Sequence, residues 1–414
     1  MNANNKFLYS EILLFCLTFS NWIWSGAPSY VWALNYFTIF CAMFIVGEIF
    51  LRKVDFGYKY MKFFYPYIII LLLVAYGFLF TDPYTRPQVT KVYFYFILTL
   101  LYFAVTFASK RSWFFWLGTN CAIFYLLANV DYINLESSRN VVIGEDRKDD
   151  INANIFGWMC IISILNANFN LFVKNNVLLA KWLPKLLIKL YYLGITVSSS
   201  YAILFATGGS RKGFILLILG FGASILFSGK LKFDAIRLIS YGIGSTLAVI
   251  LMLILVSLSP FFGRMQELFY AFSGQYYEEA SFDARILFIE EGLKIWLSSP
   301  IIGVWCRFFR EWGTYAHSNY IDLLCNYGII GFLAFYSIYY TVIKKYIWRP
   351  FKQSFNLEIK KISFFYLVIF GILIIWEIAA VTHMDRSFPP LMGTIYAMCI
   401  VNFINYRIDK RFYR

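Results

Sequence analysis

Charged residues are scarce in this sequence. Asp, Glu, Lys and Arg make up only 14% of its 414 residues, whereas a soluble domain carries about a quarter. Hydrophobic residues make up 60% and aromatic residues 21%. Such a chain cannot cover a water-facing surface, which excludes a soluble multidomain protein and indicates an integral membrane protein. The net charge of +14 does not indicate a nucleic-acid partner, because the basic residues form short clusters between long apolar runs, as in polytopic membrane proteins.

Cysteine, histidine and recognisable catalytic signatures are also scarce. The chain has seven cysteines and two histidines, too few for a disulfide framework or a structural zinc site. Most cysteines lie inside apolar runs, where a thiol behaves as a small hydrophobic group. Cys306 and Cys325 do not, but a bridge between them is disfavoured. No nucleotide-binding glycine loop, HExxH, GxSxG or kinase signature is present, and we expect no metal and no cofactor.

Long apolar runs dominate the rest of the sequence. A bilayer core requires about 20 apolar residues per helix, and twelve runs approach this length. They lie at residues 8–24, 29–51, 63–80, 92–109, 113–130, 151–173, 186–207, 212–229, 237–258, 318–343, 362–382 and 387–405. No signal-peptide cleavage site follows the first run, so we expect it to remain as a helix. The predicted fold class is an all-α polytopic integral membrane protein with about twelve transmembrane helices.

The positions of Lys and Arg predict the orientation of these helices. With the N-terminus inside, every inner loop is basic and most of the 37 Lys and Arg residues lie on the inner side. Both termini are then cytoplasmic. Of the outer loops, residues 259–317 are too long for a connector and contain an amphipathic segment. The chain therefore divides into helices one to nine at 1–258, an outer loop at 259–317, and helices ten to twelve with a cytoplasmic tail at 318–414.

The sequence Gly208-Gly209-Ser210-Arg211-Lys212 lies at the outer junction of the seventh and eighth predicted spans. One interpretation is a tight helix hairpin whose cations extend to the membrane boundary. The other is an anion site. The glycines admit the ligand, Ser210 and the next helix N-terminus donate hydrogen bonds, and Arg211 binds phosphate oxygens in bidentate fashion. The sequence alone leaves both interpretations open.

Arg285 lies in a predicted amphipathic helix at 281–299. At about 100° per residue, Ile289, Leu293 and Trp296 lie within about 80° of Arg285, whereas the acidic residues of the helix occupy another face. An arginine on an apolar face requires an anionic partner, which is either a carboxylate or a substrate phosphate.

The sequence His317-Ser318-Asn319-Tyr320 begins the tenth predicted span. On a helix, His317 shares a face with Leu324, Gly328 and Gly331, and the two glycines allow a neighbouring helix or a ligand to come close. A single histidine at a membrane boundary is more often a hydrogen-bonded polar residue than a catalyst, so this position alone does not establish a site.

Three further polar residues have simpler interpretations. His383 lies in the turn His383-Met384-Asp385-Arg386, for which a solvated loop with an internal ion pair is favoured. Glu48 precedes Arg52 by four residues, so a local ion pair explains it. Glu377 lies deep in the eleventh span without a local cation. It is expected to face the bundle interior, where it orients an arginine or carries a proton.

Together these motifs resemble the O-antigen ligase and polymerase family. His317-Ser318, nine residues and Gly328-Ile329-Ile330-Gly331 are similar to that family's outer-face signature, a histidine followed by Asn, Ser or Gln, nine residues and Gly-x-x-Gly. The Gly-Ser-Arg-Lys sequence at 209–212 and an arginine some thirty residues before the histidine match in order and topology. The resemblance covers roughly 200–345. Phe332 stands where ligases often have Thr, which favours a polymerase slightly.

The resemblance implies a GT-C-like glycosyltransferase on the periplasmic face of the bacterial inner membrane. Its donor is a glycan on undecaprenyl diphosphate. The acceptor is a sugar hydroxyl of the next lipid-linked repeat unit in a polymerase, or the lipid A core in a ligase. Arg211 and Arg285 would stabilise the diphosphate. His317 would act as general base, since the unperturbed pKa of histidine is ~6.5.

The remaining site residues follow from the same resemblance. The expected substrate-binding residues are Ser210, Lys212, Asn319, Tyr320 and Trp312. Aromatic side chains that could stack on sugar rings are Trp296, Trp312, Tyr276, Tyr277 and Tyr315. A chain-length regulator protein is a candidate partner alongside the lipid-linked substrates and membrane lipid, and no nucleic acid is expected.

A secondary transporter, such as a flippase for lipid-linked sugars, is the competing class. Twelve spans with both ends inside suit a transporter equally well. Transporters of this kind usually have two related halves, short loops and a binding site near the midplane. Here no internal symmetry is visible, the long outer loop follows the ninth span, and the candidate residues lie at the outer boundary. The sequence therefore favours an enzyme.

Overall fold

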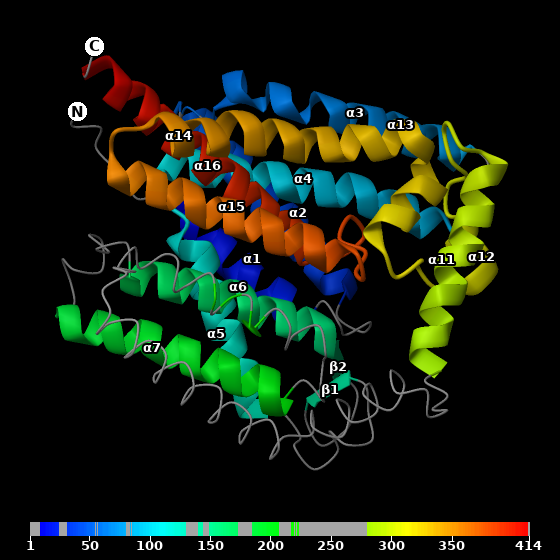
Figure 1. Cartoon of the computed structure of the whole chain (residues 1–414), viewed down its shortest axis with the longest axis horizontal. Coiled ribbons are helices and arrows are strands. Elements are labelled where there is room, and N and C mark those ends of the chain that lie inside the picture. Colours follow the sequence, from blue (N-terminus) through cyan, green and yellow to red (C-terminus); the bar gives the residue numbers. More distant parts are fainter. Residues whose placement is uncertain are drawn as a thin grey trace, which may run out of the picture. The chain divides into compact units, whose positions relative to one another are not determined.

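The computed structural model is almost entirely helical (Figure 1). It describes residues 9–24, 31–53, 57–79, 85–129, 140–143, 149–172, 184–206 and 280–412, together with positions 55, 83, 217, 218, 220 and 222. Seven of the described helices are long and apolar enough to cross a membrane. The predicted class, an all-α polytopic membrane protein, is therefore confirmed.

Ten of the twelve predicted spans coincide with helices of the structure. The helices are α1 (Tyr9–Trp24), α2 (Val31–Leu51), α3 (Tyr65–Phe78), α4 (Arg86–Ser109), α5 (Trp113–Asn129), α6 (Ala153–Phe172), α7 (Lys185–Tyr201), α13 (Asn319–Thr341), α15 (Leu357–Glu377) and α16 (Phe388–Phe412). The predicted spans at 212–229 and 237–258 fall almost wholly outside the described residues. The total of twelve stays a prediction.

Two compact units make up the chain. The first comprises Met1–Asn21, Asn35–Phe115 and Glu278–Arg414, and the second comprises Trp22–Leu34 and Trp116–Tyr277. In the second unit, α6 packs on α7 through a cluster of Ala167, Ile188, Tyr192 and Ile195. A short antiparallel pair, β1 (Asn140–Ile143) and β2 (Asp149–Asn152), pairs Asn140 with Asn152 in register.

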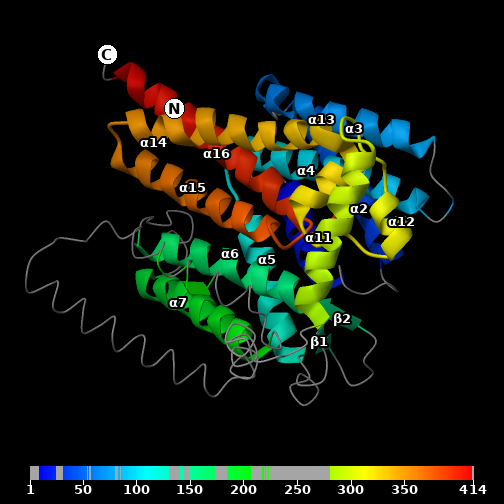
Figure 2. The ribbon, with the colours of Figure 1, turned by 45° about the vertical axis from the view of Figure 1, so that its right-hand side comes forward.

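The first unit contains the segments that carry the predicted histidine and its neighbours. Its α16 packs closely on α4, because Gly393 of α16 lies where a methyl group would be 2.4 Å from the carbonyl oxygen of Thr99. The α15–α16 contact includes a hydrogen bond from Asn402 Nδ2 to Ser363 Oγ at 2.8 Å. Figures 1 and 2 show α13 running beside α3 in this unit.

The helix α13 continues beyond its α-helical part. It runs through a π-helical stretch, η5 (Val342–Trp348), into α14 (Arg349–Gln353), so that residues 319–353 form one candidate span of 35 residues. At about 1.5 Å per residue this span is ~50 Å long. Its two ends therefore lie near opposite membrane boundaries.

Candidate functional site

The helix before the predicted histidine packs against the helix that follows it. The helix α11 (Ala280–Ser298) occupies the segment expected to be amphipathic. A methyl group at Gly292 would lie 2.3 Å from Cγ2 of Ile321 in α13, and the carbonyl oxygen of Gly292 accepts a hydrogen bond from Cys325 Sγ at 3.0 Å. Only a residue without a side chain allows α11 and α13 to approach this closely.

The loop after α11 enters a break in α13. Gly328 has φ 61° and ψ −167° inside that helix, a combination that only glycine adopts readily. The break frees backbone groups that the loop satisfies. Val304 N–H donates to the carbonyl of Cys325 at 2.7 Å, and Ile329 N–H donates to the carbonyl of Pro300 at 2.9 Å. The expected close approach at Gly328 is thus a backbone loop of the same chain.

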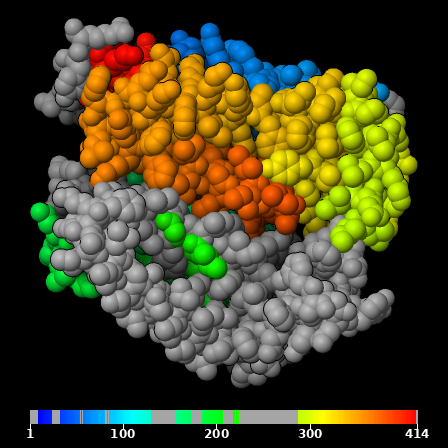
Figure 3. Space-filling model, in the orientation of Figure 1, coloured from blue at the N-terminus to red at the C-terminus, as the bar shows by residue number. Residues whose placement is uncertain are grey.

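An aromatic cluster lies between α11 and the short helix α12 (Arg307–Trp312). Phe288 of α11 contacts Phe308 and Trp312, with ring centroids 5.7 Å and 5.6 Å apart. The ring of His317 stacks on the same Phe288, with centroids 5.5 Å apart and planes 19° apart. Figure 3 shows α11 at the surface of the chain next to the start of α13. The Phe288 ring therefore packs against the imidazole ring, while the side chain of His317 stays exposed.

His317 lies in a turn rather than in the helix. Its φ is 54°, in the left-handed region, and α13 begins two residues later with Ser318 as N-cap. The predicted helical face shared with Leu324 and Gly331 was therefore wrong. Asp322, buried in the first turn of α13, accepts a hydrogen bond from the backbone N–H of Ala316 at 3.2 Å. This bond fixes the residue immediately before the histidine.

A buried polar network lies behind this turn. Asn319 Oδ1 accepts hydrogen bonds from the backbone N–H groups of Thr382 and His383, at 3.0 Å and 3.2 Å. It also contacts His383 Nδ1 at 2.8 Å, which makes Nδ1 the protonated ring nitrogen. Asn326 Nδ2 donates to Asp322 Oδ2 at 2.8 Å, and Asn326 Oδ1 accepts from the backbone N–H of Cys306 at 3.0 Å. The network ties the start of α13 to two loops.

His383 is buried, contrary to the favoured interpretation of a solvated loop. Its Nε2 lies 3.3 Å from Asp322 Oδ2, and its ring meets the rings of Tyr327 and Phe335 edge-on. Burial lowers the pKa of His383 to about 3, so the side chain is neutral at physiological pH. The composition of this short turn does not show that residues of α13 pack against it and bury His383.

The expected ion pair within the same turn is also absent from the structure. Arg386 donates instead to Asn21, Asn35 and Thr38, at 2.8 Å, 2.7 Å and 3.1 Å. Burial lowers the pKa of Arg386 to about 10, and burial raises the pKa of Asp385, whose carboxylate accepts hydrogen bonds from Ser387. The arginine therefore joins the turn after α15 to α1 and α2.

The acids Glu48 and Glu377 both bind neighbouring side chains. Glu48 pairs with Arg52 at 3.1 Å, as predicted, and it also accepts hydrogen bonds from Tyr9 and Ser10. Glu377 is fully buried and faces the interior of the unit, as predicted, but it is the last residue of α15 rather than deep in the span. It accepts hydrogen bonds from Tyr336, Tyr339 and Thr382.

Arg285 lies in α11, one helical turn before Phe288. The buried residues on α11 include Gly292 and Ile295, whereas Ile289 and Leu293, predicted to lie on the inward face, are exposed. Arg285 lies within about 80° of Gly292 and Ile295 at about 100° per residue. The backbone thus places Arg285 near the side of α11 that carries the histidine's stacking partner, and the side chain of Arg285 lies outside the described part of the chain.

The other predicted site residues are distributed differently. Trp312 is 38% exposed in the aromatic cluster. Tyr320 stacks on Tyr336 and donates to the carbonyl of Ile374 at 3.0 Å, and Asn319 is fully buried. Tyr315 donates to Gln88 at 2.8 Å, and burial raises the pKa of Tyr315. Outside the described residues lie Ser210, Arg211, Lys212, Tyr276 and Tyr277.

Sequence reasoning missed the residues that hold the histidine in place. Neither Phe288 nor Asp322 was singled out from the sequence. An acid in the first turn of a span, five residues after a histidine, was the available signal, since such an acid needs a partner. Both Cys306 and Cys325 are free thiols, and within the described residues no three His, Cys, Asp or Glu side chains group as metal ligands.

These features define a polytopic membrane protein with an exposed histidine on a structured loop at the end of a span. Residues 195–336, about a third of the chain, match the family model for O-Antigen ligase. The match confirms the resemblance found in the sequence, and it includes Arg211, Arg285 and His317. No curated protein matches the chain.

Proposed function

We propose that this protein is a glycosyltransferase that polymerises O-antigen or related polysaccharide repeat units on the periplasmic face of the bacterial inner membrane. The match of residues 195–336 to the O-Antigen ligase family model supports activity of the ligase or polymerase type. The observation that carries the proposal is the stacking of exposed His317 on Phe288. It brings the helix that contains Arg285 beside a histidine whose turn is held by buried hydrogen bonds.

The proposed donor is a glycan on undecaprenyl diphosphate. His317 removes the proton from an acceptor sugar hydroxyl, and that oxygen attacks the anomeric carbon of the donor. The bond from this carbon to the diphosphate oxygen breaks, and undecaprenyl diphosphate leaves with the electron pair. Arg285 and Arg211 stabilise the negative charge that develops on the leaving group. The proton then resides on His317 until water accepts it, and the step requires no metal or cofactor.

The remaining predicted site residues have different roles in this proposal. Ser210 and Lys212 contact the donor phosphates, and Trp312 offers a flat surface to a sugar ring. Tyr320 lies beside the same boundary. Asn319 acts through its hydrogen bonds to the turn at His383, so we assign it a positioning role rather than a contact with substrate.

A ligase that transfers the glycan to the lipid A core is the alternative enzyme. Purified protein with a radiolabelled lipid-linked repeat unit tests the choice. Formation of a ladder of longer lipid-linked glycans supports the polymerase. Transfer only when lipid A core is added supports the ligase. A chain-length regulator protein, if it is a partner, would narrow the ladder when added, without being required for transfer.

A flippase for lipid-linked sugars is the alternative from another class. The same purified protein in vesicles distinguishes it. Movement of a labelled donor between leaflets, with no new glycosidic bond, would contradict the enzyme. The loop after α11 inserts into the break of α13 through backbone hydrogen bonds. A structured outer loop of this kind favours a chemical site at the boundary over a binding site at the midplane.

A further inference from the structure

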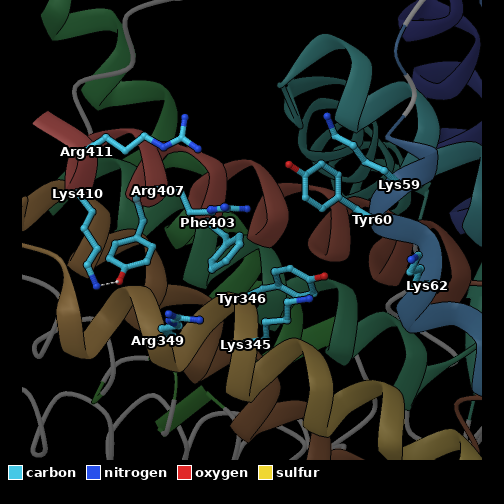
Figure 4. Close-up of a pocket in the computed structure, with 11 residues that line it drawn as sticks. Lys59, Tyr60, Lys62, Lys345, Tyr346, Arg349, Phe403, Arg407, Lys410 and Arg411 are labelled. Carbon is cyan, nitrogen blue, oxygen red and sulfur yellow. Dashed lines mark hydrogen bonds between the residues drawn. The ribbon is translucent and has the colours of Figure 1, made fainter.

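A pocket lined by cations lies in the first unit, far from His317. Its volume is about 520 Å³. Figure 4 shows basic side chains from three parts of the chain around it. Lys59 and Lys62 come from a 3-10 helix, η2 (Tyr58–Phe64). Lys345 and Arg349 come from η5 and the start of α14, and three more cations come from residues 407–411 at the end of α16.

The pocket is separate from the candidate active site. Lys345 follows Asn319 by 26 residues along one continuous helical span, which corresponds to ~40 Å at about 1.5 Å per residue. One candidate span begins at Tyr58, and two others end at Gln353 and Arg411. The ends of three spans therefore meet here, at the membrane boundary opposite to the one that carries His317.

Positive charge in this pocket is not balanced by the described protein. Seven Lys and Arg side chains line it and no Asp or Glu does. None of the seven forms an ion pair with a carboxylate in the described part of the chain. Asp409, the acid within the same turns of α16, contacts Ser354 Oγ at 3.5 Å instead. Cations grouped around one hollow repel each other unless an anion joins them.

Aromatic rings form part of the pocket wall and hold several of the cations. Lys345 lies over the ring of Tyr346 at 5.0 Å from its centroid, and Arg407 lies over Phe403 at 6.0 Å. Tyr346 and Phe403 are buried and pack edge to face, 5.2 Å apart. The contacts with buried rings therefore restrict the positions of these two cations, unlike those of lysines on a solvated helix face.

The π-helical geometry of η5 is an independent sign of function. A π-helical stretch in a long helix is uncommon and occurs frequently at functional sites. Here it carries Lys344 and Lys345 where α13 passes into α14. A second pocket of about 490 Å³ shares Lys345 and Arg349 with the first and adds Lys344 and Lys352. The two pockets form one basic surface at the end of α13.

We propose that this basic pocket binds the headgroup of a membrane lipid that carries two phosphate groups. Several cations arranged around a hollow at a membrane boundary suit a ligand with more than one negative charge. Two phosphates can engage cations from η2, from η5 and α14, and from α16 at the same time. The bound lipid would then join the ends of three spans. The proposal does not depend on the reaction that the opposite boundary performs.

A lipid-binding measurement on the full chain tests this proposal. The protein in neutral detergent is titrated with cardiolipin, whose headgroup carries two phosphates, and with phosphatidylcholine as the neutral lipid, and bound lipid is counted by native mass spectrometry. The double variant Lys345→Gln, Arg407→Gln should bind cardiolipin about 30-fold more weakly, because each cation at a lipid phosphate contributes roughly a fivefold factor. The matched control is Lys360→Gln, Lys361→Gln, which removes the same charge outside the pocket.

The outcomes separate the proposal from its alternatives. Selective loss in the pocket variant, with the control unchanged, supports a built lipid site. Equal loss in both variants, or no loss in either, would overturn it and leave a solvated basic cluster that serves only to orient the spans. A titration with sodium pyrophosphate tests whether the pocket binds a free ion instead of a lipid headgroup. If the pocket variant loses pyrophosphate binding while its cardiolipin binding is unchanged, the pocket holds a free ion and the lipid assignment is wrong.

Discussion

At the scale of single residues, the conformation of His317 is the most informative feature of the candidate site. A non-glycine residue with φ near 54° is uncommon, although histidine is one of the residues that accept this region. Ala316 before it is anchored to Asp322, and Ser318 after it caps α13. The surrounding contacts therefore determine the turn and present the imidazole outward, as the proposed role of general base requires.

His317→Gln and His317→Ala should both abolish glycan transfer, by a factor of about 100 or more, because neither side chain can remove a proton. Both variants should still fold, since the ring is exposed, although they lose the stacking on Phe288. Transfer is measured with purified protein and a labelled lipid-linked donor, and protein amounts are matched by immunoblotting. Glu290→Gln is the control, because this exposed residue of α11 has no role in the proposed reaction. Full transfer by His317→Gln would remove this residue from the mechanism.

His383 should make stability depend on pH. Its pKa is about 3 in the folded chain and ~6.5 in the unfolded chain. Between these values the unfolded state binds the additional proton, so stability falls as pH decreases, by at most about 1.4 kcal/mol per pH unit. The thermal unfolding temperature of the detergent-solubilised protein should drop more steeply from pH 7 to pH 5 than that of His383→Phe. Parallel curves for the two proteins would contradict this assignment.

At the scale of elements, the site depends on the break in α13 at Gly328. Gly328 is left-handed, and a methyl group there would lie 2.3 Å from the carbonyl oxygen of Ile301. The loop after α11 can therefore dock only because residue 328 has no side chain. The first glycine of the signature admits a backbone loop of the same chain, whereas the sequence predicted the approach of a neighbouring helix or a ligand.

Gly328→Ala should lower the amount of folded, membrane-inserted protein strongly. The strain at this φ and ψ costs about 1–3 kcal/mol, and the clash with Ile301 adds to it. Gly371→Ala is the matched control, because Gly371 lies in α15 with nothing within 4 Å of the added methyl group. Detergent-resistant, monodisperse protein is measured by size-exclusion chromatography. Equal yields of the two variants would mean that the loop docks by other contacts.

The elements themselves were largely predictable, whereas their contacts were not. Apolar runs of about 20 residues have few alternatives to a helix in lipid, so ten predicted spans recur as helices. The hydrogen bonds of Arg386 to α1 and α2 depend on residues some 350 positions away. The burial of His383 depends on residues of α13. No local pattern can supply either. The same holds for Phe288 beneath His317, because a helix period identifies a face but not its partner.

At the scale of the whole molecule, hydrogen bonds within the first unit fix which span ends lie together. Tyr315 contacts Gln88 near the start of α4, and Asn319 contacts His383 just before α16. At the opposite end, residues of η2, of η5 and the start of α14, and of the end of α16 line the pocket. Along the chain, the span ends near His317 alternate with the span ends at the pocket, as consecutive membrane spans require. The excess of Lys and Arg then predicts that the pocket end is cytoplasmic.

Cysteine labelling should resolve this orientation, with one introduced thiol near each end of the first unit. Glu290→Cys lies on α11 beside the histidine, and Lys352→Cys lies at the end of α14, and both positions are exposed. A membrane-impermeant maleimide should label Glu290→Cys in intact spheroplasts and should label Lys352→Cys only after permeabilisation. The seven native cysteines are buried or partly buried, so the unsubstituted protein provides the background. Labelling of Lys352→Cys in intact spheroplasts, with Glu290→Cys protected, would invert the topology. It would place His317 on the cytoplasmic side and contradict the proposed periplasmic site.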